Sequence, residues 1–417
     1  MQLVVIGGGA AGFFCAITAA RVNPSLDVML IEKSGKLLSK VRISGGGRCN
    51  VTHACFSILE MTGKYPRGGR FVKKAFHRFF TTDTIAWFRQ RGVELKAEAD
   101  GRMFPVSDSS ETIISCLLKE ADKFGVRIRL NREVKDLRKT GDKWSLTFAN
   151  GEQEEADRVC IACGGYSKAS MFDWLLQTGH HYENPVPSLF TFNIPNNGIT
   201  RLMGISVPLV KIKIQGTKLE EEGPVLITHW GISGPAALRL SSRGARELAA
   251  MAYSFSISIN WLPEFSDQRL DALFQEFRTN NGSQKVLSRN GLVLPQRLWE
   301  YFCEISGVGP ELRWADLPAS RQHKLAATVC NMELAVKGKT TFKEEFVTAG
   351  GIRLSEIDAL TMESKLASGL FFAGEIMDVD GVTGGFNFQH AWTSGWIAGN
   401  SLSLPPRIKK TSGSIYV

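Results

Sequence analysis

The sequence contains little cysteine or proline and no long uncharged segment. Eight of its 417 residues are cysteine and 15 are proline, which excludes a disulfide scaffold and a collagen-like chain and favours reduced thiols in a cytoplasmic protein. No Cys/His group has zinc spacing, so no metal is expected. The residues before Arg21 are uncharged but lack the basic start of a signal peptide, and no other uncharged run could span a bilayer.

Positive charge and glycine are in excess instead. Lys and Arg total 50 against 41 Asp and Glu, a net charge of +9, so a basic face or an anionic partner is expected. The stretch from Lys64 to Arg78 has no acid and interleaves aromatic residues, a pattern found on nucleic-acid surfaces. Its helical spacing from Phe71 favours the other interpretation, an amphipathic helix with a solvated basic side. The cations are Lys64, Arg67, Arg70, Lys73, Lys74 and Arg78; Tyr65, Phe71 and Phe76 lie between them, and Phe79 and Phe80 follow directly.

The N-terminal segment predicts a strand, a glycine turn and a helix. Gly7, Gly9 and Gly12 follow an apolar run in a GxGxxG pattern. The first glycine permits a tight turn, the second lets backbone approach a diphosphate, and the third lets helix pack on strand. The next apolar run ends at Glu32, 20 residues after Gly12, where an acid meets a ribose diol and repels a 2′-phosphate. Because no second such motif lies between a strand and a helix, we expect one tightly held dinucleotide, FAD rather than NAD.

A second glycine cluster, Ser44 to Thr52, carries a resemblance to a known family. Residues 40–52 match the pattern K-x-x-x-S-G-G-G-R-C-N-x-T of the aminoacetone oxidase or BaiN-like FAD-binding proteins, also called NAD(FAD)-utilising dehydrogenases. The sequence resembles that family over essentially its whole length. Further matching segments are Thr228 to Pro235, Thr361 to Lys365, Ala373 to Glu375 and Asp378 to Gln389.

The resemblance implies roles for several residues. Arg48 and Asn50 are expected near the isoalloxazine and the pyrophosphate. The strand that ends at Ala162–Gly165 is similar to one that approaches the adenosine half, although Cys163 replaces the usual Thr. The backbone of Val134 is similar to one that touches adenine. His53 and His390 stand where Asn and Trp are common, which alters the substrate side.

The C-terminal segment predicts contacts with the flavin half. Gly374 ends a strand and leaves room for a sugar chain, while Glu375 or Asp378 accepts hydrogen bonds from ribityl hydroxyls. A helix pattern after Gly384 and Gly385 can stabilise negative charge at flavin N1 and O2. The predicted cofactor-binding residues are Gly7, Gly9, Ala10, Ala11, Gly12, Glu32, Lys33, Lys40, Ser44, Gly45, Gly46, Arg48, Cys49, Asn50, Val134, Ala162, Cys163, Gly164, Gly374, Glu375, Asp378, Gly384, Gly385, Phe386, Asn387 and Phe388.

Candidate catalytic residues are fewer, because flavin chemistry needs little more than orientation, electrostatics and sometimes one base. His229 and His390 are the candidate bases, and either could equally be a structural histidine. Cys49 is interpreted as a small packing residue, with a redox thiol or covalent attachment point as the alternative.

The fold class expected is α/β, a Rossmann-like FAD-binding domain of the two-dinucleotide-fold type with an inserted β-rich domain and a helical subdomain. The FAD-binding domain is expected over 1–191 and 343–417, the β-rich domain over 192–264 and 331–342, and the helical subdomain over 265–330.

The expected function is that of an FAD-dependent oxidoreductase that transfers hydride between the flavin and a small organic substrate. The resemblance implies amine oxidation with oxygen or reduction of an enone-like compound, with NAD(P)H or oxygen as electron partner. Two alternatives remain open, a flavoprotein that acts on tRNA and a non-catalytic flavin-bound redox sensor.

Overall fold

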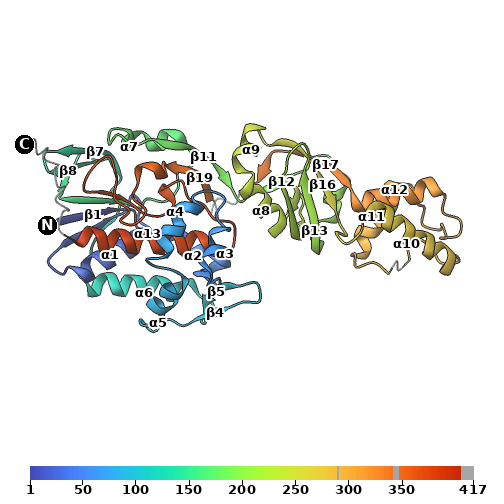
Figure 1. Cartoon of the computed structure of the whole chain (residues 1–417), viewed down its shortest axis with the longest axis horizontal. Helices are drawn as coiled ribbons and strands as arrows, with labels where there is room; N and C mark the ends of the chain where they lie inside the picture. Colours follow the sequence, from blue (N-terminus) through green and yellow to red (C-terminus); the bar gives the residue numbers. More distant parts are fainter. Residues whose placement is uncertain (289–290, 341–346, 405–417) are drawn as a thin grey trace, which may run out of the picture. The chain divides into compact units, whose positions relative to one another are not determined.

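The computed structural model describes residues 1–288, 291–340 and 347–404, and the chain divides into two compact units (Figure 1). Unit 1 comprises Met1–Val186 and Val347–Val417, and unit 2 comprises Pro187–Phe346. Each unit has its own cluster of buried hydrophobic residues. Among the described residues no helix is long and apolar enough to cross a membrane.

Unit 1 is built on a five-stranded parallel sheet in the order β20-β10-β1-β2-β6. Its three central strands are short apolar runs with almost every residue buried, as expected for a parallel sheet covered on both faces. The predicted strands and the helix after the glycine turn are confirmed. The sheet strands are β1 (Gln2–Ile6), β2 (Asp27–Ile31), β6 (Arg127–Arg129), β10 (Arg158–Ile161) and β20 (Leu370–Phe372).

Two helices from opposite ends of the sequence, α1 (Ala10–Val22) and α13 (Phe386–Ser403), lie side by side in unit 1 (Figure 1). Their close approach depends on glycine. A Cβ on Gly395 would lie 2.4 Å from the carbonyl oxygen of Ala11, and one on Gly399 would lie 2.5 Å from that of Cys15. The backbones therefore meet where no side chain fits, which fixes α13 against α1.

Smaller elements complete unit 1 around this core. Three smaller sheets have the orders β3-β5-β4, β7-β8-β9 and β11-β19, and the first two are antiparallel. Their strands are β3 (Thr52–His53), β4 (Leu95–Ala97), β5 (Arg102–Pro105), β7 (Val134–Thr140), β8 (Lys143–Phe148), β9 (Gln153–Ala156), β11 (Tyr182–Ser188), whose last two residues belong to unit 2, and β19 (Val347–Ile352). The helices are α2 (Ser39–Gly47), α3 (Ile58–Thr62), α4 (Gly69–Phe76), α5 (Thr81–Arg89), α6 (Ser110–Lys123) and α7 (Asp173–Leu176).

Unit 2 combines a seven-stranded antiparallel sheet, in the order β17-β16-β13-β14-β15-β12-β18, with five α-helices and a 3-10 helix (Gly198–Leu202) among its described residues. One hydrophobic cluster includes side chains of both the sheet and α10–α12. The β-rich insertion and its helices are thus observed, as part of the predicted α/β fold. The elements are β12 (Thr191–Asn193), β13 (Ser206–Ile214), β14 (Glu220–Ile227), β15 (Gly231–Ser233), α8 (Pro235–Arg243), α9 (Ala245–Ala250), β16 (Ser254–Asn260), α10 (Asp267–Asn280), α11 (Gln296–Ser306), α12 (Ala319–Cys330), β17 (Met332–Lys337) and β18 (Lys339–Thr340).

Candidate functional site

Three glycines shape the turn between β1 and α1, for different reasons. Gly7 has a φ of +118°, and a Cβ there would lie 2.4 Å from the carbonyl oxygen of Ala162. A Cβ on Gly12 would lie 1.9 Å from the carbonyl oxygen of Gly7. Gly9 differs, because a Cβ there would meet nothing within 4 Å. Gly9 is also the N-cap of α1, and no side chain caps that helix. The turn therefore leaves an open approach to helix amides of the kind that bind a diphosphate.

Glu32 lies directly after β2, where the sequence predicts the ribose-binding acid. Its Oε2 accepts a hydrogen bond from the backbone N–H of Gly8 at 2.9 Å. Its Oε1 accepts from the N–H and the hydroxyl of Ser34 at 3.0 and 2.9 Å. These bonds hold the carboxylate at the glycine turn. Because each carboxylate oxygen can accept more than one hydrogen bond, Glu32 keeps capacity for a diol.

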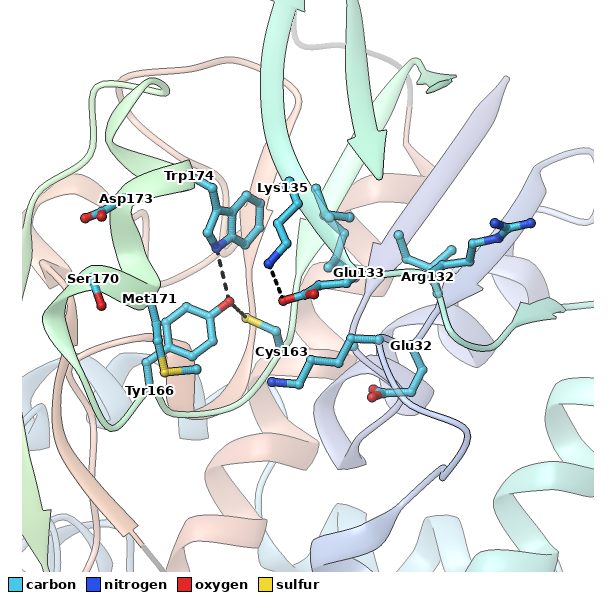
Figure 2. A pocket seen from close by; sticks show the side chains of 15 residues that line it. Glu32, Arg132, Glu133, Lys135, Cys163, Tyr166, Ser170, Met171, Asp173 and Trp174 are labelled. Atoms are coloured by element: carbon cyan, nitrogen blue, oxygen red, sulfur yellow. Dashed lines mark hydrogen bonds and ion pairs between the residues drawn. The ribbon is translucent and has the colours of Figure 1, made fainter. Parts of the chain in front are cut away.

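A pocket of about 330 Å³ lies beside these residues and is lined from β1, β2, the start of β7 and residues 163–174. Figure 2 shows Tyr166 and Trp174 on one side of the pocket and Glu32 on the other. Val134 and Cys163, both predicted for the adenosine half, also line it. Flat aromatic faces opposite an acceptor for a diol suit the adenosine end of a dinucleotide.

Cys163 takes part in a short hydrogen-bond chain in this pocket. Its Sγ donates to the Tyr166 hydroxyl at 3.2 Å, and the indole N–H of Trp174 donates to the same oxygen at 3.2 Å (Figure 2). Burial raises the pKa of the Cys163 thiol to about 11, so the thiol is protonated at neutral pH. The hydroxyl contact that the usual Thr would make is thus replaced here by a thiol that donates to a tyrosine of the chain.

The second glycine cluster interrupts α2 with consecutive left-handed residues. Gly45, Gly46 and Gly47 have φ values of +59°, +70° and +86°. A Cβ on Gly45 would lie 2.7 Å from the ring of Phe104, whereas one on Gly46 or Gly47 would meet nothing within 4 Å. The loop therefore needs glycine partly because its turn is left-handed. The glycines also leave one side of the backbone open, as a loop that lies along a ligand requires.

Arg48 follows this loop and is anchored by the protein itself. Its Nη1 lies 2.6 Å from Oε1 of Glu98, and its guanidinium lies 3.9 Å from the centroid of the Phe104 ring. The hydrogen bond to Glu98 is the main cause that raises the pKa of Arg48. The predicted contact of Arg48 with the flavin stays a prediction.

Cys49 is completely buried and has a φ of +64°. Burial raises the pKa of its thiol to about 12. A protonated, enclosed thiol is a poor nucleophile, so the environment favours the packing role over a redox or covalent one.

Asn50 joins the glycine cluster to the start of α13. With its amide oriented to satisfy both neighbours, Nδ2 donates to the carbonyl of Thr52 at 3.0 Å and Oδ1 accepts from the N–H of Gly385 at 2.9 Å. The hydroxyl of Thr52 donates to Oε1 of Gln389 at 2.6 Å. These bonds hold the two segments predicted for the flavin half together across more than three hundred residues of sequence.

Glu375 lies at the carboxyl end of β20 and meets a lysine from the other motif. Its Oε2 lies 2.6 Å from Nζ of Lys40, and its Oε1 accepts from the N–H of Thr348 at 2.9 Å. The hydroxyl of Thr348 is buried without a hydrogen-bond partner among the described residues. A Cβ on Gly165 would lie 2.9 Å from that hydroxyl. The cluster therefore combines a cation, a carboxylate and an unsatisfied hydroxyl, which suits phosphate and sugar hydroxyl groups.

The two candidate bases lie in different units and in different surroundings. His390 is buried in α13, and its Nε2 lies 3.3 Å from the carbonyl oxygen of Gly374, while its Nδ1 has no partner among the described residues. Burial lowers the pKa of His390 to about 4. His229 is exposed, between β14 and β15 of unit 2, with its ring centroid 4.3 Å from that of Trp230. A catalytic role for either one stays a prediction.

The middle of the basic stretch forms the amphipathic helix α4, and the aromatic residues of the stretch are buried, so the prediction that they form a nucleic-acid surface is wrong. The aromatic side chains from Tyr65 to Phe80 are at most 8% exposed, and two of them, Phe71 and Phe76, lie on the buried side of α4. Lys64, Arg70, Lys73 and Lys74 are exposed. These buried rings therefore cannot stack on bases, whereas the exposed cations can still contact phosphates.

Unit 1 contains all the predicted cofactor-binding residues, and their contacts with FAD stay a prediction. Several residues that hold the loop before α13, residues 378–386, were not predicted from the sequence. The Tyr65 hydroxyl donates to the carbonyl of Phe386 at 2.6 Å, and Arg67 forms a two-point ion pair with buried Asp380. Asp380 lies inside the matched motif Asp378 to Gln389, but no local pattern reveals a partner 313 residues away.

Comparison with known proteins shows the family of the chain. Residues 1–401 match the HI0933-like protein Rossmann domain. The chain is 31% identical to a ribosomal RNA dihydrouridine synthase of Escherichia coli, over 96% of this chain and 97% of that protein. It is 26% identical to a 3-dehydro-bile acid delta(4,6)-reductase of Clostridium scindens, over 97% and 100%. A solved 3-ketosteroid-delta4-(5alpha)-dehydrogenase of Rhodococcus jostii is similar in fold, with a TM-score of 0.51, 14% identity and 97% coverage of both chains.

Proposed function

Because the chain belongs to the HI0933-like Rossmann flavoprotein family and is an FAD-dependent oxidoreductase, we propose that it reduces a carbon–carbon double bond conjugated to a carbonyl group. The observation that carries this proposal is the chemistry shared by two whole-length relatives. Dihydrouridine is uridine saturated at the double bond next to its C4 carbonyl, and a 3-dehydro bile acid carries a ketone that can conjugate with such a bond. Both names describe addition of two hydrogens to an enone-like system.

We further propose that the double bond belongs to a uracil ring in RNA. Two relatives at 31% and 30% identity, each matched over at least 96% of this chain, are ribosomal RNA dihydrouridine synthases. The net charge of +9 suits a polyanionic substrate. This substrate class replaces the tRNA alternative with the RNA class that the relatives name.

The cofactor fits the residues present in unit 1. Gly9, Gly46 and Gly47 present backbone to open space, and the hydroxyl of Thr348 is buried and unsatisfied beside Glu375. Reduced FAD, when bound, supplies the hydride. Glu32 would hold the ribose, the N-terminus of α1 the diphosphate, and Lys40 with Glu375 the sugar chain. The uncapped N-terminus of α13 would favour negative charge on the reduced ring.

The reaction can be tested with protein reduced anaerobically by NADPH or dithionite. The reduced flavin is mixed with unmodified ribosomal RNA transcripts, with a steroid enone, with oxygen-containing buffer and with oxygen-free buffer. In a second anaerobic mixture, protein with oxidised flavin is combined with a panel of primary amines. We expect the RNA to reoxidise the flavin and to gain dihydrouridine, detected by mass spectrometry of the nucleosides. A transcript in which uridines carry no 5,6 double bond is the matched control. Reoxidation by oxygen alone, with no RNA or enone turnover, would contradict the proposal.

A small enone is the second candidate substrate, favoured by the bile acid reductase relative. The same experiment separates it, because turnover of the steroid enone without turnover of RNA would assign the protein to small-molecule reduction. Reduction of the oxidised flavin by amines in the second anaerobic mixture would instead support the amine oxidation that the resemblance implied.

A further inference from the structure

The helix α4 has one exposed face made of cations. Arg70, Lys73 and Lys74 lie three and four residues apart, and Arg78 continues the same face just beyond the helix end. Residues at this spacing share one side of a helix. The opposite side carries Phe71, Val72, Ala75 and Phe76, all of which are buried. The cations are therefore fixed on a helix whose position is set by the core.

These cations differ from most others in unit 1, because no ion pair within the described ranges involves them. Arg42, Arg91, Arg102 and Arg127, by contrast, each pair with a carboxylate. Residues 61–82 contain no Asp or Glu. Like charges four residues apart on a helix repel each other. An external anion bound to this face would reduce that repulsion.

Residues 65–68, just before α4, contact the loop before α13, residues 378–386, which contains predicted flavin contacts. Arg67 forms an ion pair with Asp380, and Tyr65 donates to the carbonyl of Phe386. Gly68, the N-cap of α4, has a φ of +78°, and a Cβ there would lie 2.6 Å from the side chain of Val379. Figure 1 shows α4 beside α13. A polyanion on α4 would thus lie beside the loop that holds the predicted flavin contacts.

We propose that the exposed cations Arg70, Lys73, Lys74 and Arg78, here called the α4 basic face, bind the phosphate backbone of the RNA substrate. This inference rests on the proposed function. The face supplies position and not sequence recognition, since phosphate contacts carry no base information. Arg67 is excluded from the face because Asp380 already binds it.

If the α4 basic face binds phosphates, the affinity for RNA should depend on salt concentration by a predictable amount. Each phosphate neutralised on a nucleic acid contributes roughly 0.7 to 0.9 to the slope of log affinity against log salt concentration. Removing two cations should therefore reduce the slope by about 1.5 and weaken binding by at least about tenfold near 0.1 M salt.

The test compares two double variants of the full-length holoprotein. Arg70→Gln/Lys74→Gln removes one arginine and one lysine from the face. Arg21→Gln/Lys119→Gln removes the same pair of residue types from exposed positions on α1 and α6. Affinity for a ribosomal RNA transcript is measured by fluorescence anisotropy over a series of salt concentrations. FAD content and Tm of both variants are measured alongside, so that loss of folding is detected.

We expect the first variant to lose affinity and slope and the second to match the unaltered protein. Equal affinity and slope in both variants would overturn the α4 basic face while leaving RNA reduction standing. RNA binding that depends on the face, without any dihydrouridine formed, would uphold the face and overturn the proposed function. Binding of vesicles that contain anionic lipid, with none of RNA at low salt, would overturn the RNA assignment and point to a membrane surface.

Discussion

Single glycines in unit 1 serve two purposes that the structure separates. Gly7 and Gly12 are glycine because the protein's own backbone occupies the space of a Cβ. Gly9 has no such neighbour and an ordinary φ of −97°, so a side chain would fit the protein there. Gly46 and Gly47 also face open space, but their left-handed φ values favour glycine by themselves. Glycine at position 9 is therefore explained by a ligand that approaches the backbone closely, which is the role assigned to the middle glycine of the GxGxxG turn.

This difference predicts opposite outcomes for two substitutions to alanine. Gly9→Ala should leave the free energy of unfolding of the FAD-free protein nearly unchanged and weaken FAD binding by at least about tenfold, or about 1.4 kcal/mol. Gly12→Ala should destabilise the FAD-free protein by about 1–3 kcal/mol, because its Cβ would overlap the turn. Urea unfolding and flavin fluorescence titration measure the two quantities. Normal FAD affinity in Gly9→Ala would contradict the diphosphate site.

His390 predicts a dependence of stability on pH. Its pKa is lowered from 6.5 to about 4 by burial, so the unfolded chain binds a proton that the folded chain does not between these values. Stability therefore falls as pH falls through this window, by roughly 2 kcal/mol from about pH 7.5 to about pH 5 for this one group. At neutral pH the imidazole is uncharged, so it can act as a base but not as a ready acid.

Urea unfolding at the two pH values tests this expectation. His390→Gln should lose less stability than the unaltered protein when the pH is lowered. His77→Gln, which removes an exposed imidazole, is the matched substitution. An unchanged loss in His390→Gln would show that burial of this ring does not govern the pH dependence.

Elements of secondary structure were predictable where the pattern is local. The apolar runs before Gly7 and Glu32 indicated β1 and β2, and the spacing from Phe71 indicated α4. Contacts between distant elements were not predictable from one sequence. The place of β20 beside β10, and the bond of Asn50 to Gly385, join segments hundreds of residues apart. No propensity or period encodes such pairing.

The basic stretch shows the same limit within one element. Its charges and aromatic rings alternate in a pattern that fits both a nucleic-acid-binding surface and an amphipathic helix. Only the burial of the rings distinguishes the two. The rings pack against the core, while the cations stay exposed. The sequence thus indicated which residues could meet an anion, but not that Arg67 is already paired with Asp380.

At the scale of the whole molecule, the chain has two hydrophobic cores, and the second lies within one continuous segment. Unit 2 has its own seven-stranded sheet, with Trp261, Trp299 and Trp314 among its buried side chains. Unit 1 needs both ends of the chain, because β20 and α13 pack on β10 and α1. Unit 2 therefore has what an independent domain requires, and the FAD-binding fold does not lie within it.

We predict that residues 187–346, expressed alone, fold without FAD. The isolated segment should show a single cooperative urea transition, followed by tryptophan fluorescence because its buried indoles become exposed. It should bind no FAD, since the glycine turn and Glu32 lie outside it. A protein made of residues 1–186 joined to 347–417 by a short flexible linker is the reciprocal control and should retain FAD. A segment 187–346 that unfolds without cooperativity would show that its core depends on unit 1.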